Sequence, residues 1–266
     1  MADLTLGGHR IHCVWPNGRS EGRETVVFLH DGLGTTESWK DLPQRLAEAH
    51  GLNALAYDRW GYGKSAPRPD FPFAFVEAEL PPLVQLLDKF RLGGVHLVGH
   101  SDGGTIALLL AALLPGRVLS AVTISAHVFT EPQSRAGIRD LQEAQAAGRI
   151  PPWLKKLHGR RAEKLLAAWS AGWLGMVHED WNIEGSLHQI QCPLLVVQGE
   201  HDDFGTPAQV EAIVSRVAGA ESWLVPNCGH TAYNEQPEAF RERVGDFWGR
   251  HGVGAAGKVE GGGATG

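Results

Sequence analysis

The sequence is poor in features that mark several large classes of protein. It has only three cysteines, Cys13, Cys192 and Cys228, which lie far apart and are odd in number, so we expect neither a disulfide framework nor a paired-cysteine metal site. The longest unbroken apolar run, residues 106–114, is about half of the ~20 residues that a membrane-spanning helix needs. A membrane protein is therefore not expected.

Basic charge is also in short supply. The formal net charge is -6, and no cluster of lysine and arginine is interleaved with aromatic residues. A nucleic-acid partner is not expected, because such partners select for a basic surface. The first fifteen residues, MADLTLGGHRIHCVW, have neither a basic start nor an apolar signal core, so we expect the protein in the cytoplasm.

Metal and cofactor motifs are missing as well. Thirteen histidines are present, yet no HExxH motif occurs, and the segment GEHDD at 199–203 has no second ligand at a suitable spacing. The GxxxxGK string in the tail, residues 252–266, follows no strand and precedes no helix. We expect no metal and no cofactor, and we interpret the tail as a flexible terminus.

What the chain does have is an alternation of β-rich runs with helix-like stretches. Several runs, such as TVVFLH and PLLVVQ, are continuously apolar, as expected of parallel strands covered on both faces. The pattern predicts an α/β fold with a mostly parallel central sheet flanked by helices. The expected strands are 11–15, 25–30, 53–58, 95–99, 119–126, 193–198 and 222–226, and the expected helices are 37–50, 76–91, 102–114, 208–218 and 237–249.

One region interrupts the alternation. Residues 127–190 contain no convincing strand, but they hold four of the nine tryptophans among helix-forming residues. We interpret them as an inserted helical layer on a core made of residues 1–126 and 191–251. Such large side chains either pack against the core or line a cavity.

The segment Gly99-His100-Ser101-Asp102-Gly103 has the G-x-S-x-G pattern, directly after an apolar strand and before a helix. In so tight a turn, side chains at the two glycine positions would collide. The turn would hold the Ser101 hydroxyl at a helix N-terminus, which favours negative charge. A serine that only caps the helix is the alternative, but the pattern and its placement favour a nucleophile.

A nucleophilic serine needs a base and a carboxylate that orients the base. Asp202 lies in the loop after one predicted strand, and His230 lies in the loop after the next. The carboxyl ends of parallel strands meet at one edge of a sheet, so these loops should converge on Ser101. Asp203 is the rival for the acid, and spacing alone does not exclude it.

These residues give the chain its resemblance to the α/β-hydrolase fold family. From about residue 25 to residue 247 it resembles a serine hydrolase of this family, carboxylesterase-like and with a helical cap, because Ser101, Asp202 and His230 follow the family's chain order. The resemblance implies that 127–190 is the cap. It also implies an oxyanion hole from the backbone N–H groups of Gly32, in VFLHDGLG, and Asp102.

Two features of the motifs leave alternatives open. Asp31 stands where the family often has glycine, so Leu33 competes with Gly32 as the first oxyanion donor; Asp31 itself is expected to stiffen the loop. His100 is expected to pack beside the turn, and His127 either faces the pocket or is structural. The segment YDRWGYGKS at 57–65 matches a further family motif and is assigned no chemistry. The residues expected to bind substrate are Leu33, Trp60, His127, Phe129, Trp153 and Trp173.

The reaction expected from the resemblance is hydrolysis of carboxylic esters of small to medium, mainly apolar substrates through an acyl-enzyme on Ser101. The partner is then a small-molecule ester, and the oligomeric state is open. The same triad serves lactones, thioesters, amides and carbon–carbon bonds, and the same fold supports perhydrolases and lyases. A ligand-sensing receptor is the least favoured alternative.

Overall fold

The computed structural model describes residues 2–178 and 180–254 and contains one eight-stranded sheet in the order β1-β2-β4-β3-β5-β6-β7-β8. The pairs β1/β2 and β2/β4 are antiparallel, and every other pair is parallel. The predicted fold class is confirmed. The strands are β1 Ala2–Leu6, β2 His9–Val14, β3 Thr25–Leu29, β4 Asn53–Tyr57, β5 Val95–His100, β6 Val118–Ile124, β7 Leu194–Gly199 and β8 Glu221–Val225.

Strand β1 is not among the strands expected from the sequence. It forms a hairpin with β2, and its register pairs Leu6 with His9 across Gly7-Gly8. Both glycines have positive φ (54° and 83°), the backbone conformation that a tight hairpin turn requires. The alternation of Leu4 and Leu6 before a Gly-Gly pair is the signal that would have predicted this strand.

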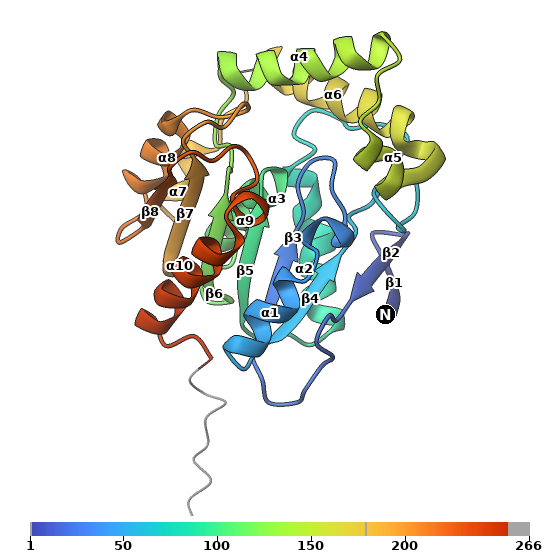
Figure 1. Cartoon of the computed structure of the whole chain (residues 1–266). Helices are drawn as coiled ribbons and strands as arrows, with labels where there is room; N and C mark the ends of the chain where they lie inside the picture. Colours follow the sequence, from blue (N-terminus) through green and yellow to red (C-terminus); the bar gives the residue numbers. More distant parts are fainter. Residues whose placement is uncertain (1, 179, 255–266) are drawn as a thin grey trace, which may run out of the picture.

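The helices of the core cover both faces of the sheet (Figure 1). Two expected helices begin later than predicted. The stretch at 37–50 opens as a 3-10 turn, Thr36–Trp39, and the one at 76–91 opens as a 3-10 turn, Glu77–Glu79. The α-helices then start beside a proline. The α-helices of the core are α1 Leu42–Ala49, α2 Leu80–Lys89, α3 Asp102–Leu113, α8 Pro207–Val214, α9 Ala232–Glu235 and α10 Pro237–Arg250.

Alternating side chains of the strands feed two separate apolar cores. In β3, Val26 and Phe28 pack in the cluster that holds Trp39 and Trp248, while Val27 and Leu29 pack in the larger cluster with α2 and α3. All five β3 residues are buried. The continuous apolar run is thus the consequence of burial on both faces.

The segment between β6 and β7 is helical, with α4 Pro132–Ala146, α5 Pro152–His158, α6 Ala162–His178 and α7 Glu184–Leu187. Figure 1 shows α4, α5 and α6 together at one end of the sheet, beyond the ends of the parallel strands. We refer to these three helices as the cap. They lie over the sheet edge at which the loops after β3, β5, β7 and β8 emerge.

Candidate active site

Ser101 sits at the sharp turn between β5 and α3. Its φ and ψ angles are 53° and -119°, a conformation rarely adopted by residues other than glycine, and its N–H donates to the Ile124 carbonyl at 2.8 Å. A Cβ atom on Gly99 would overlap the Gly103 carbonyl, so the turn requires glycine there. The Ser101 side chain makes no capping hydrogen bond to α3, which leaves the hydroxyl free for other roles.

The loops after β7 and β8 bring an acid and a base together. His230 Nδ1 and Asp202 Oδ1 are 2.7 Å apart, and the same oxygen accepts from the Phe204 N–H at 2.9 Å. Asp202 is buried, whereas Asp203 is exposed. The geometry therefore distinguishes the two neighbouring aspartates: Asp202 contacts the histidine.

The charge state of this pair follows from its surroundings. Burial of the His230 imidazole opposes its protonation, but the charge of Asp202 and the hydrogen bond to it outweigh burial and raise the pKa of His230 above its ordinary value. Burial likewise acts to raise the pKa of Asp202, yet His230 and the Phe204 N–H hold it below its usual range. Asp202 is thus a carboxylate that favours an imidazolium.

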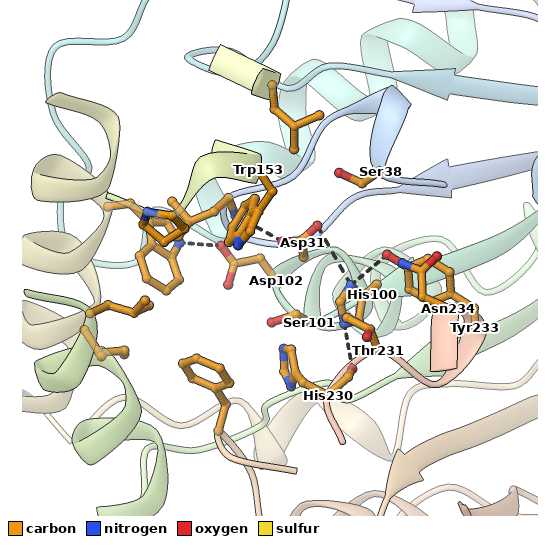
Figure 2. Close-up of a pocket in the computed structure, with 18 of the residues that line it drawn as sticks. Asp31, Ser38, His100, Ser101, Asp102, Trp153, His230, Thr231, Tyr233 and Asn234 are labelled. Atoms are coloured by element: carbon orange, nitrogen blue, oxygen red, sulfur yellow. Dashed lines mark hydrogen bonds and ion pairs between the residues drawn. The ribbon is translucent and has the colours of Figure 1, made fainter. Parts of the chain in front are cut away.

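The backbone of His230 is tied to the turn that carries Ser101. Its carbonyl accepts from His100 Nε2 at 2.9 Å and from Ser125 Oγ at 3.0 Å. His100, expected only to pack beside the turn, thus links the two loops by a hydrogen bond. Figure 2 shows this bond and places the Ser101 and His230 side chains next to one another.

The two residues expected to supply the oxyanion donors, Gly32 and Asp102, line the same cavity as Ser101. Among the described residues, neither the Gly32 N–H nor the Asp102 N–H donates to a protein acceptor. The Leu33 N–H, the alternative donor, is directed to Asp31 Oδ2 at 3.4 Å. Asp31 thus makes a contact within its own loop, and the contact leaves Gly32 as the freer donor.

The sequence predicted a role only for the backbone N–H of Asp102, yet its side chain also makes specific contacts. It is fully buried, and its two oxygens accept from the indole N–H groups of Trp169 and Trp173, each at 3.0 Å. Arg59 Nη2 lies 3.8 Å from Asp102 Oδ2. Both tryptophans belong to α6, so Asp102 joins the cap to the residue that follows Ser101.

A cavity of about 610 Å³ lies between the sheet edge and the cap, within the range typical of small-molecule sites. Ser101, Asp102 and His230 line it, and so do four of the predicted substrate-binding residues: Leu33, His127, Trp153 and Trp173. Trp169 and Phe204 also line it and were not predicted. With Tyr233, five large aromatic residues line the cavity.

Two predicted pocket residues lie elsewhere. Trp60 stacks on His9 with ring centroids 3.7 Å apart, and its N–H donates to the Pro67 carbonyl. Phe129 pairs with Asn182 in an isolated β-bridge and packs against the apolar core. Neither lines the cavity, because the chain turns each side chain toward its own neighbours.

His127 combines the two roles left open for it. It lines the cavity and packs edge-on against Trp173, while its Nε2 bonds to the Phe204 carbonyl at 3.0 Å. Burial lowers the pKa of His127, so the ring is neutral at pH 7. A neutral ring whose Nε2 donates to a carbonyl presents Nδ1 as an acceptor.

Metal-ligand clusters and membrane-spanning helices are both absent from the described part of the chain. Within residues 2–178 and 180–254, no group of three or more His, Cys, Asp or Glu side chains is placed to hold a metal ion. In the same residues, no helix is both long and apolar enough to cross a membrane. The predicted tail from residue 252 falls mostly outside the described residues.

Sequence comparisons place this site among known hydrolases. The model of the alpha/beta hydrolase family matches residues 26–243. Human serine hydrolase BPHL is 30% identical over 262 residues, covering 92% of this chain and 85% of the relative. A proline iminopeptidase from Lactobacillus crispatus is 24% identical over 273 residues, covering 88% of this chain and 93% of the relative.

Solved structures share the fold at lower identity. The enol-lactonase from Burkholderia xenovorans superposes with a TM-score of 0.73 at 20% identity, covering 93% of this chain and all of the other. A thermophilic esterase from Thermogutta terrifontis gives 0.71 at 20% identity, with 94% and 98% covered. With the family match spanning most of the sequence, the chain belongs to the alpha/beta hydrolase family and is a hydrolase.

Proposed function

We propose that the protein is a serine hydrolase that cleaves small-molecule carboxylic esters with small to medium, mainly apolar acyl groups. The observation that carries the proposal is the pairing of His230 with Asp202 at 2.7 Å beside a Ser101 held at φ 53°. A histidine oriented by a carboxylate next to a serine at a strained strand end is the arrangement that activates a hydroxyl. A cytoplasmic location of the protein stays a prediction.

The first half of the reaction transfers the acyl group to Ser101. The Ser101 Oγ attacks the ester carbonyl while His230 Nε2 takes its proton, and Asp202 stabilises the resulting imidazolium. The Gly32 and Asp102 N–H groups donate to the oxyanion of the tetrahedral intermediate. When the intermediate collapses, His230 returns the proton to the leaving alcohol and the acyl-enzyme remains.

Water completes the cycle. His230 removes a proton from a water molecule that attacks the acyl carbonyl, and a second tetrahedral intermediate forms in the same oxyanion hole. Collapse breaks the bond to Ser101 Oγ, which regains the proton from His230. The acid leaves, and the enzyme returns to its starting state.

The cavity wall supports an apolar acyl group of limited size. Trp153, Trp169, Trp173 and Phe204 provide aromatic surface. The indole N–H groups of Trp169 and Trp173 are already bonded to Asp102, so these rings contribute apolar area and no free donor to the substrate. A long polar chain would lose hydrogen bonds to water without replacement.

A second candidate is hydrolysis of a peptide or amino-acid ester that carries a free amino group; the Lactobacillus crispatus relative is named a proline iminopeptidase. The observation in its favour is Asp31, whose carboxylate lines the cavity with 22% of the side chain exposed. Burial acts to raise the pKa of Asp31, but the neighbouring His100 outweighs burial and holds the pKa below its ordinary value, so the group is anionic. An anion there would attract an α-ammonium group.

The test is a matched substrate panel with wild-type protein and Ser101→Ala. Propionate and L-alanine benzyl esters differ only in the α-amino group, and L-alanyl-p-nitroanilide replaces the ester by an amide. We expect the propionate ester to be cleaved at least as fast as the alanine ester and the anilide to be cleaved far more slowly. Ser101→Ala should lower kcat by about 10⁴-fold or more.

The results separate the candidates. Preference for the alanine ester and the anilide by tenfold or more, reversed by Asp31→Asn, would replace the proposal with the second candidate. Full activity in Ser101→Ala would overturn both, since neither works without the nucleophile. Fluorophosphonate labelling with peptide mapping gives an independent check, because the label should reside on Ser101.

A further inference from the structure

We infer that Arg59 is a positioning residue of the oxyanion hole, which orients the Gly32 peptide and neutralises the Asp102 carboxylate beside the second donor. The inference rests on the proposed function, because it assigns a role within that oxyanion hole. Arg59 lies in the YDRWGYGKS segment and does not line the cavity.

Arg59 is a cation without access to water. Only 1% of the residue is exposed, its guanidinium lies over the Tyr62 ring at 4.7 Å, and its Nε finds no hydrogen-bond partner among the described residues. Burying a charge costs several kcal/mol unless it is well paired. An apolar side chain would pack at this position without that cost. Packing alone therefore does not explain the arginine, and the contacts of its guanidinium are relevant.

The first such contact is with the peptide group between Asp31 and Gly32. Arg59 Nη2 donates to the Asp31 carbonyl at 2.8 Å, and the His30 Nδ1–H donates to the same oxygen at 2.8 Å. The carbonyl of Asp31 and the N–H of Gly32 belong to one rigid plane and point in opposite directions. Holding the carbonyl therefore aims the N–H that the oxyanion needs.

The hydrogen bonds of His30 show which of its ring nitrogens carries the hydrogen that is donated to the Asp31 carbonyl. The Arg59 backbone N–H donates to His30 Nε2 at 3.0 Å, so Nε2 is an acceptor and Nδ1 carries the hydrogen. Burial lowers the pKa of His30 well below its ordinary value, as a neutral ring requires. Arg59 thus braces the peptide directly through its side chain and indirectly through His30.

The second contact concerns charge. Asp31 and Asp102 place two carboxylates around the site where an oxyanion forms, and a negative charge there would oppose the reaction. Arg59 Nη2 lies 3.8 Å from Asp102 Oδ2, and both side chains are buried, so solvent screens the pair weakly. Within the described chain, Arg59 is the only Arg or Lys with an ion pair to either aspartate.

The cap supports the same two donors. A Cβ atom on Gly32 would overlap the indole of Trp169, and that indole donates to the Asp102 carboxylate. Trp169 therefore covers the Gly32 backbone from above, while Arg59 holds the adjoining carbonyl. Trp169 and Arg59 thus each contact both residues of the proposed oxyanion hole or the peptide group between Asp31 and Gly32.

The experiment compares Arg59→Met and Arg59→Lys with a matched control, Arg68→Met. Arg68 is also a buried guanidinium: it lies over the Phe71 ring at 4.6 Å and pairs with Glu79 at 2.7 Å, but it touches neither Asp31 nor Asp102. Each methionine variant thus removes a buried guanidinium that lies over an aromatic ring and near a carboxylate. Kinetics on the propionate ester, thermal unfolding and inhibition by phenylboronic acid are measured for each.

We expect Arg59→Met to lower kcat by about 10- to 100-fold with KM changed less than about threefold, because only the charged intermediate uses the oxyanion hole. Inhibition by phenylboronic acid, whose tetrahedral adduct with Ser101 carries a negative charge, should weaken by a similar factor. Arg59→Lys should recover part of both losses. Arg68→Met should leave kcat and boronate inhibition within about threefold of wild type.

Equal losses of kcat in Arg59→Met and Arg68→Met would overturn the inference, and so would unchanged boronate inhibition in Arg59→Met. If Arg59→Met does not fold, Arg59→Lys carries the test, and wild-type boronate inhibition in that variant would overturn it. Ser101→Ala in the same series keeps the two claims apart. Activity that survives in Ser101→Ala contradicts the proposed function, whereas activity lost there but equal in the two methionine variants contradicts only the role of Arg59.

Discussion

The loops at the strand ends and the cap above them are held in different ways. Backbone hydrogen bonds secure the loops: Ser101 N–H donates to Ile124, and the Glu200 N–H donates to Val225. The cap is joined to the core by side chains, among them Trp169, Trp173 and His158, whose Nε2 bonds to the Leu33 carbonyl at 2.8 Å.

This difference separates two kinds of effect. Backbone bonds are independent of most side-chain changes, so the geometry of the reacting groups depends on these bonds and on a few side chains that hold loop carbonyls, such as His100 and Arg59. The shape of the cavity depends on individual side-chain contacts across the cap. Substitutions at the loops should therefore act on kcat, and substitutions in the cap should act on KM and stability.

The largest effect that sharpens this comparison is expected from Asp202→Asn. Loss of the carboxylate removes the group that orients His230 and stabilises its imidazolium, so kcat should fall by about 10⁴-fold. His230 must be neutral to accept the proton, so wild-type kcat/KM should fall as pH drops through a midpoint above 6.5, the ordinary value. In Asp202→Asn the midpoint should move to lower pH.

Asp203→Asn is the matched control for this pair. Asp203 is exposed and does not contact His230, so kcat should stay within about twofold of wild type. A collapse of activity in Asp203→Asn, with Asp202→Asn nearly unaffected, would reverse the assignment of the acid.

A middle-sized effect is expected from Trp173→Phe. The change leaves one oxygen of the buried Asp102 carboxylate without its donor, which should cost about 1–3 kcal/mol of unfolding free energy. KM for the propionate ester should rise about three- to tenfold, because the ring lines the cavity. Denaturant unfolding and steady-state kinetics measure the two quantities.

Trp181→Phe supplies the comparison for Trp173→Phe. The Trp181 N–H donates to Glu77 Oε1 at 2.7 Å, and the residue is buried but does not line the cavity. A similar loss of stability with unchanged KM is expected. Equal rises in KM for both variants would contradict a local role for Trp173.

The smallest effect is expected from Trp153→Ala. The Trp153 side chain lines the cavity but the residue is 47% exposed, so unfolding free energy should change by no more than about 0.5 kcal/mol. KM should rise about two- to fivefold for a hexanoate ester and remain constant for an acetate ester. Trp60→Phe, outside the cavity, should change neither; a shift in acyl preference there would break the distinction between the regions.

The positions of Ser101, Asp202 and His230 were predictable because each has a local signature. A glycine-flanked serine follows an apolar strand, and the other two lie in loops that end in a helix start. Parallel strands carry such loops to one edge whatever the side chains in between. The structure places Ser101 and His230 in the wall of one cavity and pairs Asp202 with His230.

The contacts of Arg59, Trp60 and Trp169 were not predictable in this way. Trp60 and Trp169 are both tryptophans in family-like segments, yet one stacks on His9 at the surface and the other covers Gly32. Only the rotation of α6 over the sheet edge decides which of its faces meets Asp102. The signal for Arg59 was a basic residue directly after a buried strand, which is ambiguous until its partners are known.

The sequence by itself determined the alternation of strands and helices in the core apart from β1, the family resemblance and the chain positions of the reacting groups, because hydrophobic periodicity and glycine sterics act over a few residues. Only the tertiary structure decided which carboxylates surround the serine, which cation compensates them and which aromatic rings enclose the cavity. Those choices depend on side chains far apart in sequence, Arg59, Asp102 and Trp169 among them, whose contacts exist only once the cap has packed on the core.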